Sequence, residues 1–337
     1  MPLLAITEKI TAEKLPYRIF FIGSKKSLDQ EIIEKKLFSF YAIHTGKLRR
    51  YFSVKTVKDL LNFFYGIGES LLFLKKNKIN LVFSKGGYVA LPVSLAAFFL
   101  RIPVITHESD LIPGLTNKII AAFANKILYS FPGTYSNNKK YLFTGTPIRS
   151  EIYNSSANQG EEFLNFSQKK PIVLFLGGSQ GALQLNTLCQ NIFLKIKEFA
   201  NVVLIAGKGK KIKIKDASFQ EFEFLKEEFS DVLATSTIVI SRAGANSLFE
   251  LAALKKASII IPLASAAQDH QNKNAEFFAK NEAIHLINSN SSSNELTTQV
   301  KNKIIEWIEF PEKRKQFEKN IAKLDAPQAS SNIIKQF

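Results

Sequence analysis

The sequence predicts an α/β protein built from two domains, each with a doubly wound parallel sheet. Short runs of β-branched and aromatic residues alternate with longer segments of helical periodicity along the chain, which is typical of parallel α/β architecture. A chain of 337 residues is long enough for about two domains. Because 46% of the residues are hydrophobic, each domain can fill a core, and the composition excludes a disordered or collagen-like protein.

The first domain is predicted to span residues 1–150. Its strands are expected at residues 18–23, 41–44, 81–84, 104–107 and 126–129, with helices between them. Residues 151–170 then form a polar stretch with turn-forming residues and little periodicity. We predict the linker between the domains there.

The second domain is predicted to span residues 171–323. Its strands are expected at residues 171–176, 202–206, 238–241, 257–261 and 283–286. The last segment, residues 324–337, is short and amphipathic. We predict a helix there that packs back on the first domain.

The charge of the chain indicates an anionic partner. There are 45 Lys and Arg residues against 29 Asp and Glu residues, a formal charge of +16, which suits a nucleic acid, a nucleotide or an anionic membrane surface. Cys189 is the only cysteine, so an intrachain disulfide scaffold is excluded. The longest apolar run, residues 88–100, is shorter than the roughly 18 residues of a spanning helix, and charges come early in the chain. We therefore expect the protein on the cytoplasmic side.

Two strand-to-helix turns predict a site for a nucleotide diphosphate. Residues 171–182 form a buried strand, a glycine-rich turn and a helix start, where backbone amides and the helix dipole can meet an anion. Residues 238–247 repeat this design, and Glu250 follows them. The carboxylate of Glu250 can accept two hydrogen bonds from a ribose diol. Either turn alone would also fit a tight βα connection that binds nothing.

Three further polar segments follow predicted strands, where open α/β sheets place their ligands. Residues 268–274 carry amides that suit sugar hydroxyls, although His270 among them fits a capping role as well. The segments 84–88 and 107–110 are expected to line one cleft. Asp110 is a candidate base or orienting group, and His107 fits that role or a satisfied core histidine. No motif has metal-ligand or P-loop spacing, so we predict neither a metal site nor a P-loop ATPase.

Taken in order, these segments resemble the MurG family, glycosyltransferases of family 28 that add the second sugar to the lipid-linked peptidoglycan precursor. The resemblance spans nearly the whole chain and rests on seven motifs: Thr45-Gly-Lys-Leu-Arg-Arg50, Ser84-Lys-Gly-Gly-Tyr88, His107-Glu-Ser-Asp110, Gly114-Leu-Thr-Asn-Lys118, Gly145-Thr-Pro-Ile-Arg149, Gly177-Gly-Ser-Gln-Gly-Ala182 and Ser241-Arg-Ala-Gly-Ala245. It implies the GT-B fold, in which two Rossmann-like domains face each other across a cleft. It also implies an inverting transfer that uses no metal or other cofactor.

The resemblance assigns roles to individual residues. Arg149 and Ser179 would contact the donor diphosphate, Glu250 the ribose, and Gln271 the nucleotide sugar. Further contacts with UDP-N-acetylglucosamine would come from Gly178, Gln180, Leu225 beside Phe224, Ala245, Asn246 and Ser247. The acceptor would lie against Gly86, Gly87, Tyr88, Asp110 and Asn117, and His107 and Asp110 are the catalytic candidates. In place of a metal, Arg149 and the helix N-termini would stabilise the leaving UDP.

The resemblance departs from the family pattern at the N-terminus. Family members open with a strand and a glycine-rich loop that ends in His, and a Pro two residues later begins the first helix. Here residues 1–6 match that helix, which would put the strand, the loop and the His upstream of Met1. We therefore expect a central strand to be missing from the first sheet, because of a start site placed too late or a decayed gene.

A basic and apolar stretch predicts contact with a membrane surface. Basic residues at positions 47, 49, 50, 55 and 58 precede a run of apolar residues between positions 60 and 74, and three lysines follow at 75, 76 and 78. This resembles a basic-rimmed apolar surface that rests on an anionic bilayer, although a core helix would be equally apolar.

The resemblance thus implies transfer of N-acetylglucosamine from its UDP donor to undecaprenyl-diphospho-muramoyl-pentapeptide. The enzyme would be peripheral at the cytoplasmic face of the cell membrane, without a nucleic-acid partner. Two alternatives stay open: a related GT-B transferase with another lipid acceptor, and a noncatalytic UDP-sugar-binding protein. A Rossmann oxidoreductase ranks last, because neither turn has the G-x-G-x-x-G spacing with an acid about 20 residues on.

Overall fold

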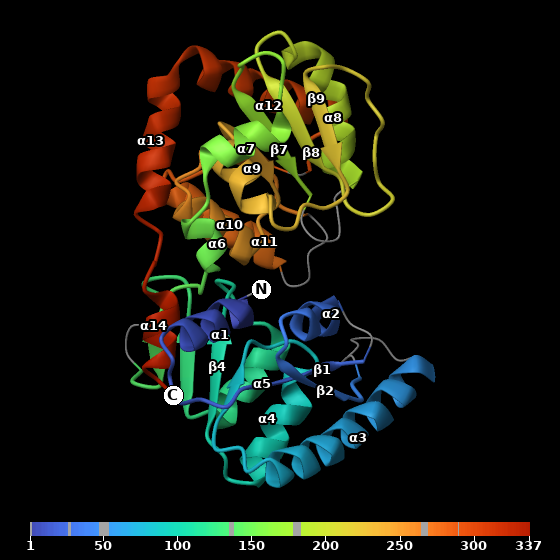
Figure 1. The fold of residues 1–337 in the computed structure, drawn as a ribbon, viewed down its shortest axis with the longest axis vertical. Coiled ribbons are helices and arrows are strands. Elements are labelled where there is room, and N and C mark those ends of the chain that lie inside the picture. The colour runs from blue at the N-terminus through green and yellow to red at the C-terminus, as the bar shows by residue number, and fades with distance from the viewer. Residues whose placement is uncertain are drawn as a thin grey trace. The chain divides into compact units, whose positions relative to one another are not determined.

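The structure, a computed structural model, describes residues 2–25, 28–46, 54–134, 138–177, 183–263, 269–288 and 290–337. The chain divides into two units. The N-terminal unit contains Leu3–Pro147 together with Gln328–Phe337, and the C-terminal unit contains Ile148–Pro327. In each unit, helices pack on parallel strands (Figure 1).

The C-terminal unit is built on one parallel sheet with the order β12-β11-β10-β7-β8-β9. Its strands are β7 (Ile172–Leu176), β8 (Asn201–Ile205), β9 (Phe219–Phe222), β10 (Ile238–Ser241), β11 (Ser258–Ile260) and β12 (His285–Leu286). All residues of β7 and β8 are buried, because helices cover both faces of a parallel sheet. This explains why these strands are continuous apolar runs in the sequence.

Two helices cover one face of this sheet, α8 (Leu183–Ile196) and α12 (Ser293–Glu309). The core between them and the strands includes Val173, Phe175, Leu204 and Trp307, the single tryptophan of the chain, which is fully buried. The remaining helices of this unit beyond the connecting segment are α9 (Phe229–Thr235), α10 (Ala245–Ala253), α11 (His270–Lys280) and α13 (Pro311–Ala322). Pro311 occupies the first helical position of α13, where its missing N–H costs no hydrogen bond.

The segment predicted as a linker, residues 151–170, is largely helical. It contains most of α6 (Ser150–Tyr153) and all of α7 (Ala157–Leu164), and α7 packs against α9 within the C-terminal unit. The Ser156 side chain caps α7 by accepting from Gln159 N, and Ser156 N donates to Asp231 Oδ1 over 2.7 Å. The polar composition therefore belongs to a short capped helix that buries one side, and the division between the units falls at Pro147 and Ile148 instead.

The strands of the N-terminal unit form two separate pieces. β1 (Phe20–Ser24) pairs with β2 (Ser39–Ile43), while β3 (Val82–Ser84), β4 (Val104–Glu108), β5 (Lys126–Tyr129) and β6 (Tyr141–Phe143) form a four-stranded sheet. Within the described part of the chain, no strand joins β1 to β3. The chain enters this unit through α1 (Pro2–Ala12), which is the helix expected for its first residues.

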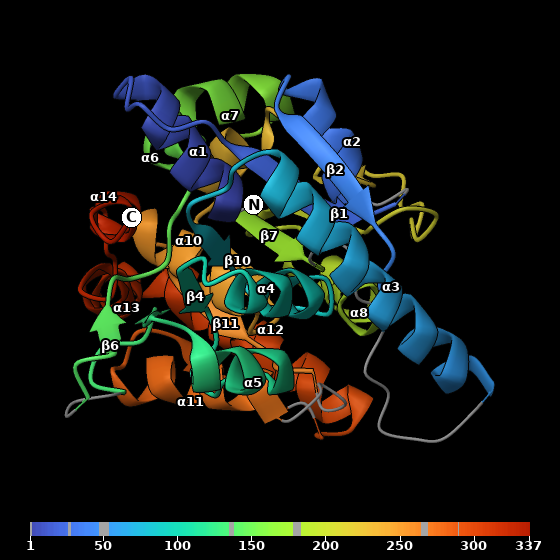
Figure 2. The ribbon, with the colours of Figure 1, turned by 90° about the horizontal axis from the view of Figure 1, so that it is seen from below.

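The other helices of this unit are α2 (Leu28–Lys35), α3 (Val54–Lys76), α4 (Ala90–Phe99), α5 (Leu115–Phe123) and α14 (Ala329–Ile334). Figure 2 shows α3, the long blue helix, running beside α4. The C-terminal helix α14 packs into the N-terminal unit, where Ile333 and Ile334 join Ile6, Ile105 and Leu128 in one core cluster. Residues far apart in the sequence thus complete this core.

Each strand expected from the sequence overlaps a strand of the structure, and two strands were not expected. β6 has only three residues, and none of them is fully buried. β9 has only two apolar residues, one at each end with two polar residues between them, and only Phe219 is buried. Both lie at sheet edges, where a strand needs less apolar sequence than a central one.

Candidate functional site

The second glycine turn has the geometry of an anion site. β10 ends at Ser241, and Gly244, in an extended conformation, precedes α10 without any side-chain cap. The first amides of α10 therefore have no intrahelical acceptor and can meet a ligand. Ala245 at this helix start is buried, Asn246 is exposed and Ser247 is half-buried. The first glycine turn lies at residues 178–182, so Gly178, Ser179 and Gln180 fall outside the described residues.

Arg242 joins the loops around this turn, and it was not among the site residues predicted from the sequence. Its Nη1 donates to Ile261 O and Pro262 O, both over 3.0 Å, and its Nη2 donates to Gln184 Oε1 over 2.7 Å. The guanidinium thus links the ends of β10 and β11 to the first turn of α8. The position of Arg242 inside the Ser241-Arg-Ala-Gly-Ala245 motif was the only sequence signal that could have indicated a role. Its hydrogen-bond partners could not be predicted, because they lie in distant segments of the chain.

Glu250 lies in the second turn of α10, and Arg149 acts on it electrostatically. Burial raises the pKa of the Glu250 carboxyl, and the positive charge of Arg149 opposes that shift. Arg149 Nη1 donates to Glu151 Oε2 over 2.9 Å, while its Nε is buried without a partner among the described residues. A buried N–H without an acceptor is costly, so this guanidinium has a donor available for an anionic ligand.

Gln271 and Asn274, on α11, contact the loops at the same end of the sheet. Gln271 Oε1 accepts from Leu263 N over 2.9 Å, and the buried Asn274 donates to Ala243 O over 3.3 Å. Asn274 was not singled out from the sequence, because polar residues crowd that stretch. After β9, Phe224 is exposed and Leu225 is half-buried, so an aromatic surface lies beside the backbone predicted to hold the base.

The N-terminal unit gathers a second set of polar residues at the ends of β3 and β4. Gly86 and Gly87 have positive φ angles of 77° and 84°, and a Cβ on Gly86 would lie 2.7 Å from Asn117 Oδ1. Glycine is thus required where the loop after β3 passes Asn117. Asn117 Nδ2 donates to Glu108 Oε2 over 2.8 Å, which fixes the orientation of its amide.

His107 is fully buried, and both of its ring nitrogens have partners. Nε2 lies 2.9 Å from Gly145 O, and Nδ1 lies 2.6 Å from Lys85 Nζ. Burial and the neighbouring Lys85 charge hold the pKa of His107 well below its usual range, so the ring is neutral. This arrangement suits a positioning role for His107.

Asp110 and Tyr88 lie nearer the surface of the same loops. Asp110 N donates to Glu108 Oε1 over 3.0 Å, and Gly114 N donates to Glu108 Oε2 over 3.2 Å. Glu108 therefore shapes the loop that carries Asp110, and burial raises the pKa of its carboxyl. Tyr88 is 38% exposed, and its hydroxyl lies 3.4 Å from Ser24 Oγ at the end of β1. The polar segments predicted at residues 84–88 and 107–110 are thus neighbours.

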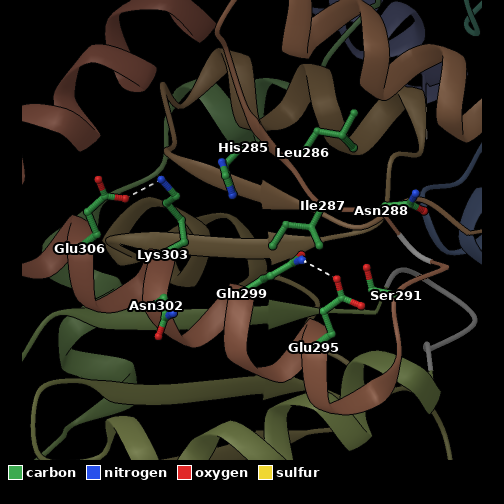
Figure 3. Close-up of a pocket in the computed structure, with 10 residues that line it drawn as sticks. All are labelled: His285, Leu286, Ile287, Asn288, Ser291, Glu295, Gln299, Asn302, Lys303 and Glu306. Carbon is green, nitrogen blue, oxygen red and sulfur yellow. Dashed lines mark hydrogen bonds and ion pairs between the residues drawn. The ribbon is translucent and has the colours of Figure 1, made fainter.

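A pocket of about 800 Å³ opens elsewhere in the C-terminal unit, between β12 and α12 (Figure 3). Its charged side chains already have partners, since Lys303 pairs with Glu306, and Glu295 accepts from Gln299 over 3.2 Å. None of the residues predicted to bind donor or acceptor lines this pocket. It therefore does not belong to the candidate site.

Within the described ranges, no cluster of three or more His, Cys, Asp or Glu side chains could hold a metal ion. No helix among the described residues combines the length and the apolar character that crossing a membrane requires.

Solved structures share the fold over nearly the whole chain. The crystal structure of Acinetobacter baumannii MurG aligns with a TM-score of 0.74 at 21% identity, covering 99% of this chain and 94% of that one. A UDP-GlcNAc 2-epimerase from Neisseria meningitidis, bound to UDP-GlcNAc, aligns with a TM-score of 0.68 at 14% identity, covering 98% of this chain and 94% of that one. The predicted pair of Rossmann-like domains of the GT-B type is thereby confirmed.

Sequence relatives are closer. The UDP-N-acetylglucosamine--N-acetylmuramyl-(pentapeptide) pyrophosphoryl-undecaprenol N-acetylglucosamine transferase of Clostridium novyi (strain NT) is 38% identical over 99% of this chain and 93% of its own length. Its namesake from Clostridium tetani (strain Massachusetts / E88) is 42% identical over 80% of this chain and 76% of its own length. Residues 1–129 match the glycosyltransferase family 28 N-terminal domain, and residues 172–336 match the family 28 C-terminal domain. The resemblance seen in the sequence is therefore confirmed, and the chain belongs to glycosyltransferase family 28.

Proposed function

We propose that this chain transfers N-acetylglucosamine from UDP-N-acetylglucosamine to undecaprenyl-diphospho-muramoyl-pentapeptide. The activity for which the Clostridium relatives are named supports this, since the alignment with one of them covers 99% of the chain. The observation that carries the donor assignment is the buried Nε of Arg149, which has no partner within the described part of the chain, in a guanidinium that also acts on the carboxylate of Glu250. A cation and a carboxylate placed together match the diphosphate and the ribose diol of one nucleotide.

On the donor side, Arg149 and the free amides at the start of α10 hold the diphosphate. Glu250 accepts from the ribose hydroxyls, and Gln271 contacts the sugar. Gly178, Ser179 and Gln180 add contacts from the first glycine turn, and Leu225 contacts the base through its backbone. As the bond from the sugar C1 to the diphosphate oxygen breaks, these donors stabilise the negative charge that develops on UDP. No metal is required for that step.

On the acceptor side, the 4-hydroxyl of the muramoyl sugar attacks C1, and its proton passes to the Asp110 carboxylate. Gly86, Gly87 and Tyr88 line the acceptor, and Asn117 with Glu108 fixes the loop that carries Asp110. His107 acts through its two ring hydrogen bonds rather than by taking the proton. A carboxylate at a loop tip suits a general base.

The decisive experiment measures UDP release from UDP-N-acetylglucosamine with three acceptors: the lipid-linked muramoyl-pentapeptide, a diacylglycerol and none. Release that needs the muramoyl acceptor, with a matching disaccharide product by mass spectrometry, supports the proposal. Release with diacylglycerol alone indicates a related transferase with another lipid acceptor. Tight UDP binding without release under any condition indicates a noncatalytic UDP-sugar-binding protein.

We also propose that the protein is peripheral on the cytoplasmic, anionic face of the cell membrane through the α3 apolar face. This face consists of exposed apolar side chains on one side of the helix: Leu60, Leu61, Phe64, Tyr65 and Leu72. Exposed lysines stand near both ends of the helix, at positions 58, 75 and 76. An apolar face with a basic rim suits the interface of a bilayer that carries anionic lipids.

Replacing Leu61 and Phe64 with Ser is expected to lower binding to vesicles containing phosphatidylglycerol by about 10-fold or more, because two apolar side chains no longer enter the bilayer interface. Vesicle sedimentation measures the bound fraction. The matched control is Leu194→Ser on α8, since Leu194 is equally exposed but lies in the C-terminal unit. Equal binding of the double variant and the parent would contradict the proposed surface.

A further inference from the structure

Lys85 lies among the acceptor-side loops, and the reaction described above does not use it. The residue directly follows β3, and its side chain is largely buried. Its Nζ lies 2.6 Å from His107 Nδ1 and 2.5 Å from Ser109 Oγ. The His107 ring and the Ser109 hydroxyl are both neutral. The two hydrogen bonds of the Lys85 ammonium therefore hold these side chains in place and form no ion pair.

The hydrogen bonds of His107 determine its tautomer. Gly145 O can only accept, so the proton of the neutral ring resides on Nε2. Nδ1 then carries the lone pair, and Lys85 is the group that donates to it. Lys85 therefore joins the loop after β3 to β4 and, through the ring, to Gly145 in the segment that follows β6.

Lys85 also reaches the loop that carries Asp110. Ser109, which accepts from Lys85, is the residue directly before Asp110. From the other side, the Glu108 carboxylate accepts from Asp110 N and Gly114 N. The loop is thus held at two points, one through Lys85 and one through Glu108. Loss of the Lys85 contact or of the Glu108 contacts leaves buried polar atoms unpaired. This loss favours other conformations of the loop, in which these atoms can find partners.

The charge of Lys85 depends on pH within the physiological range. Burial lowers the pKa of Lys85 to about 7, while the carboxylates of Glu108 and Asp110 oppose that shift. The groups around the ammonium are His107, Ser109, Glu108 and Asp110. Lys85 is therefore charged below a pH of about 7 and becomes neutral as the pH rises through that value.

We propose that Lys85 is a positioning residue for the acceptor half of the transfer: through His107 and Ser109 it fixes the loop that presents Asp110, and its charge attracts the Asp110 carboxylate. This inference rests on the proposed function. It adds to the acceptor site a residue of the loop after β3 that acts through His107 and Ser109 rather than on the reacting atoms.

Lys85→Met keeps the length of the side chain but removes both hydrogen bonds and the charge. We expect kcat to fall about 100-fold, because a small displacement of a catalytic group costs rates of this order. The KM for UDP-N-acetylglucosamine and the affinity for UDP should stay within about two-fold, since the C-terminal unit provides the donor contacts. The matched control is Lys118→Met, an exposed lysine on α5, which should retain the parent kcat. A Lys85→Met kcat within about three-fold of the parent would overturn the inference.

The pH profile separates this role from a purely structural one. The parent kcat should decline as the pH rises through about 7, where Lys85 loses its proton. Lys85→Arg keeps the charge at every pH tested, so this decline should vanish in that variant, whatever its absolute rate. A decline that persists in Lys85→Arg overturns the proposal.

Two readouts need no turnover and keep this inference separate from the proposed function. The chain has four histidines, so ¹⁵N spectra can resolve His107. Its Nδ1 chemical shift should change in Lys85→Met, because that variant removes the donor to Nδ1, while Gly145 O keeps the proton on Nε2. Hydrogen exchange at the amides of Asp110 and Gly114 should be faster in the variant. Unchanged exchange and an unchanged His107 Nδ1 shift overturn the inference, whereas absence of transfer by the parent with both changes present overturns the proposed function alone.

Discussion

Arg149→Met is expected to lower kcat/KM for UDP-N-acetylglucosamine by about 100- to 1000-fold. The guanidinium has a buried Nε without a partner among the described residues, and its charge acts on Glu250. Charge-assisted hydrogen bonds to a leaving diphosphate strengthen as negative charge develops, so their loss lowers kcat as well as donor affinity. Steady-state kinetics and calorimetric UDP titration measure the two effects.

Two matched variants test the reason for this loss. Glu151→Gln removes the exposed ion-pair partner of Arg149 Nη1 and should leave kcat/KM within about two-fold, because surface pairs contribute little. Arg149→Lys keeps the positive charge but loses the planar guanidinium, so its kcat/KM should lie between those of the parent and Arg149→Met. If Arg149→Met retains the parent kcat/KM, the donor diphosphate lies elsewhere and the proposed site is wrong.

Gly66→Ala is expected to destabilise the N-terminal unit by about 3 kcal/mol, near the upper end for overpacking. Gly66 lies on α3 where that helix crosses the end of β2, and a Cβ there would lie 2.2 Å from the backbone oxygen of His44. The obstacle is backbone, which cannot turn away as a side chain can. Gly68→Ala, on the same helix with no atom within 4 Å, should be neutral or stabilise by up to about 1 kcal/mol.

The two units can be followed separately during urea unfolding. Trp307, the only tryptophan, is buried in the C-terminal unit, so its fluorescence follows that unit, while circular dichroism follows both. Gly66→Ala should lower the midpoint of the circular dichroism transition more than that of the fluorescence transition. Equal destabilisation by Gly66→Ala and Gly68→Ala would show that the contact between α3 and His44 does not govern stability.

The segment predicted as a linker shows that a polar stretch can be helical. Residues 151–170 are polar and lack a long period, yet α7 forms there because Ser156 caps it and α9 offers a partner surface. A helix of eight residues, with its polar side in solvent, carries too few apolar positions to reveal a period. Similarly, β6 and β9 are short edge strands whose pairing comes from their neighbours.

The sequence by itself determined the fold class, the positions of the central strands along the chain and the family, because these depend on local runs of apolar residues and on motifs contiguous in the chain. It also placed Arg149, Glu250, His107 and Asp110 among the candidates. Only the tertiary structure decided which groups meet. It showed that Lys85 holds His107 and Ser109, and that Arg242 joins β11 to α8. Such contacts join residues about 20 to 60 positions apart in the chain, and burial away from water, which no local pattern records, makes each of these hydrogen bonds strong and costly to leave unmade.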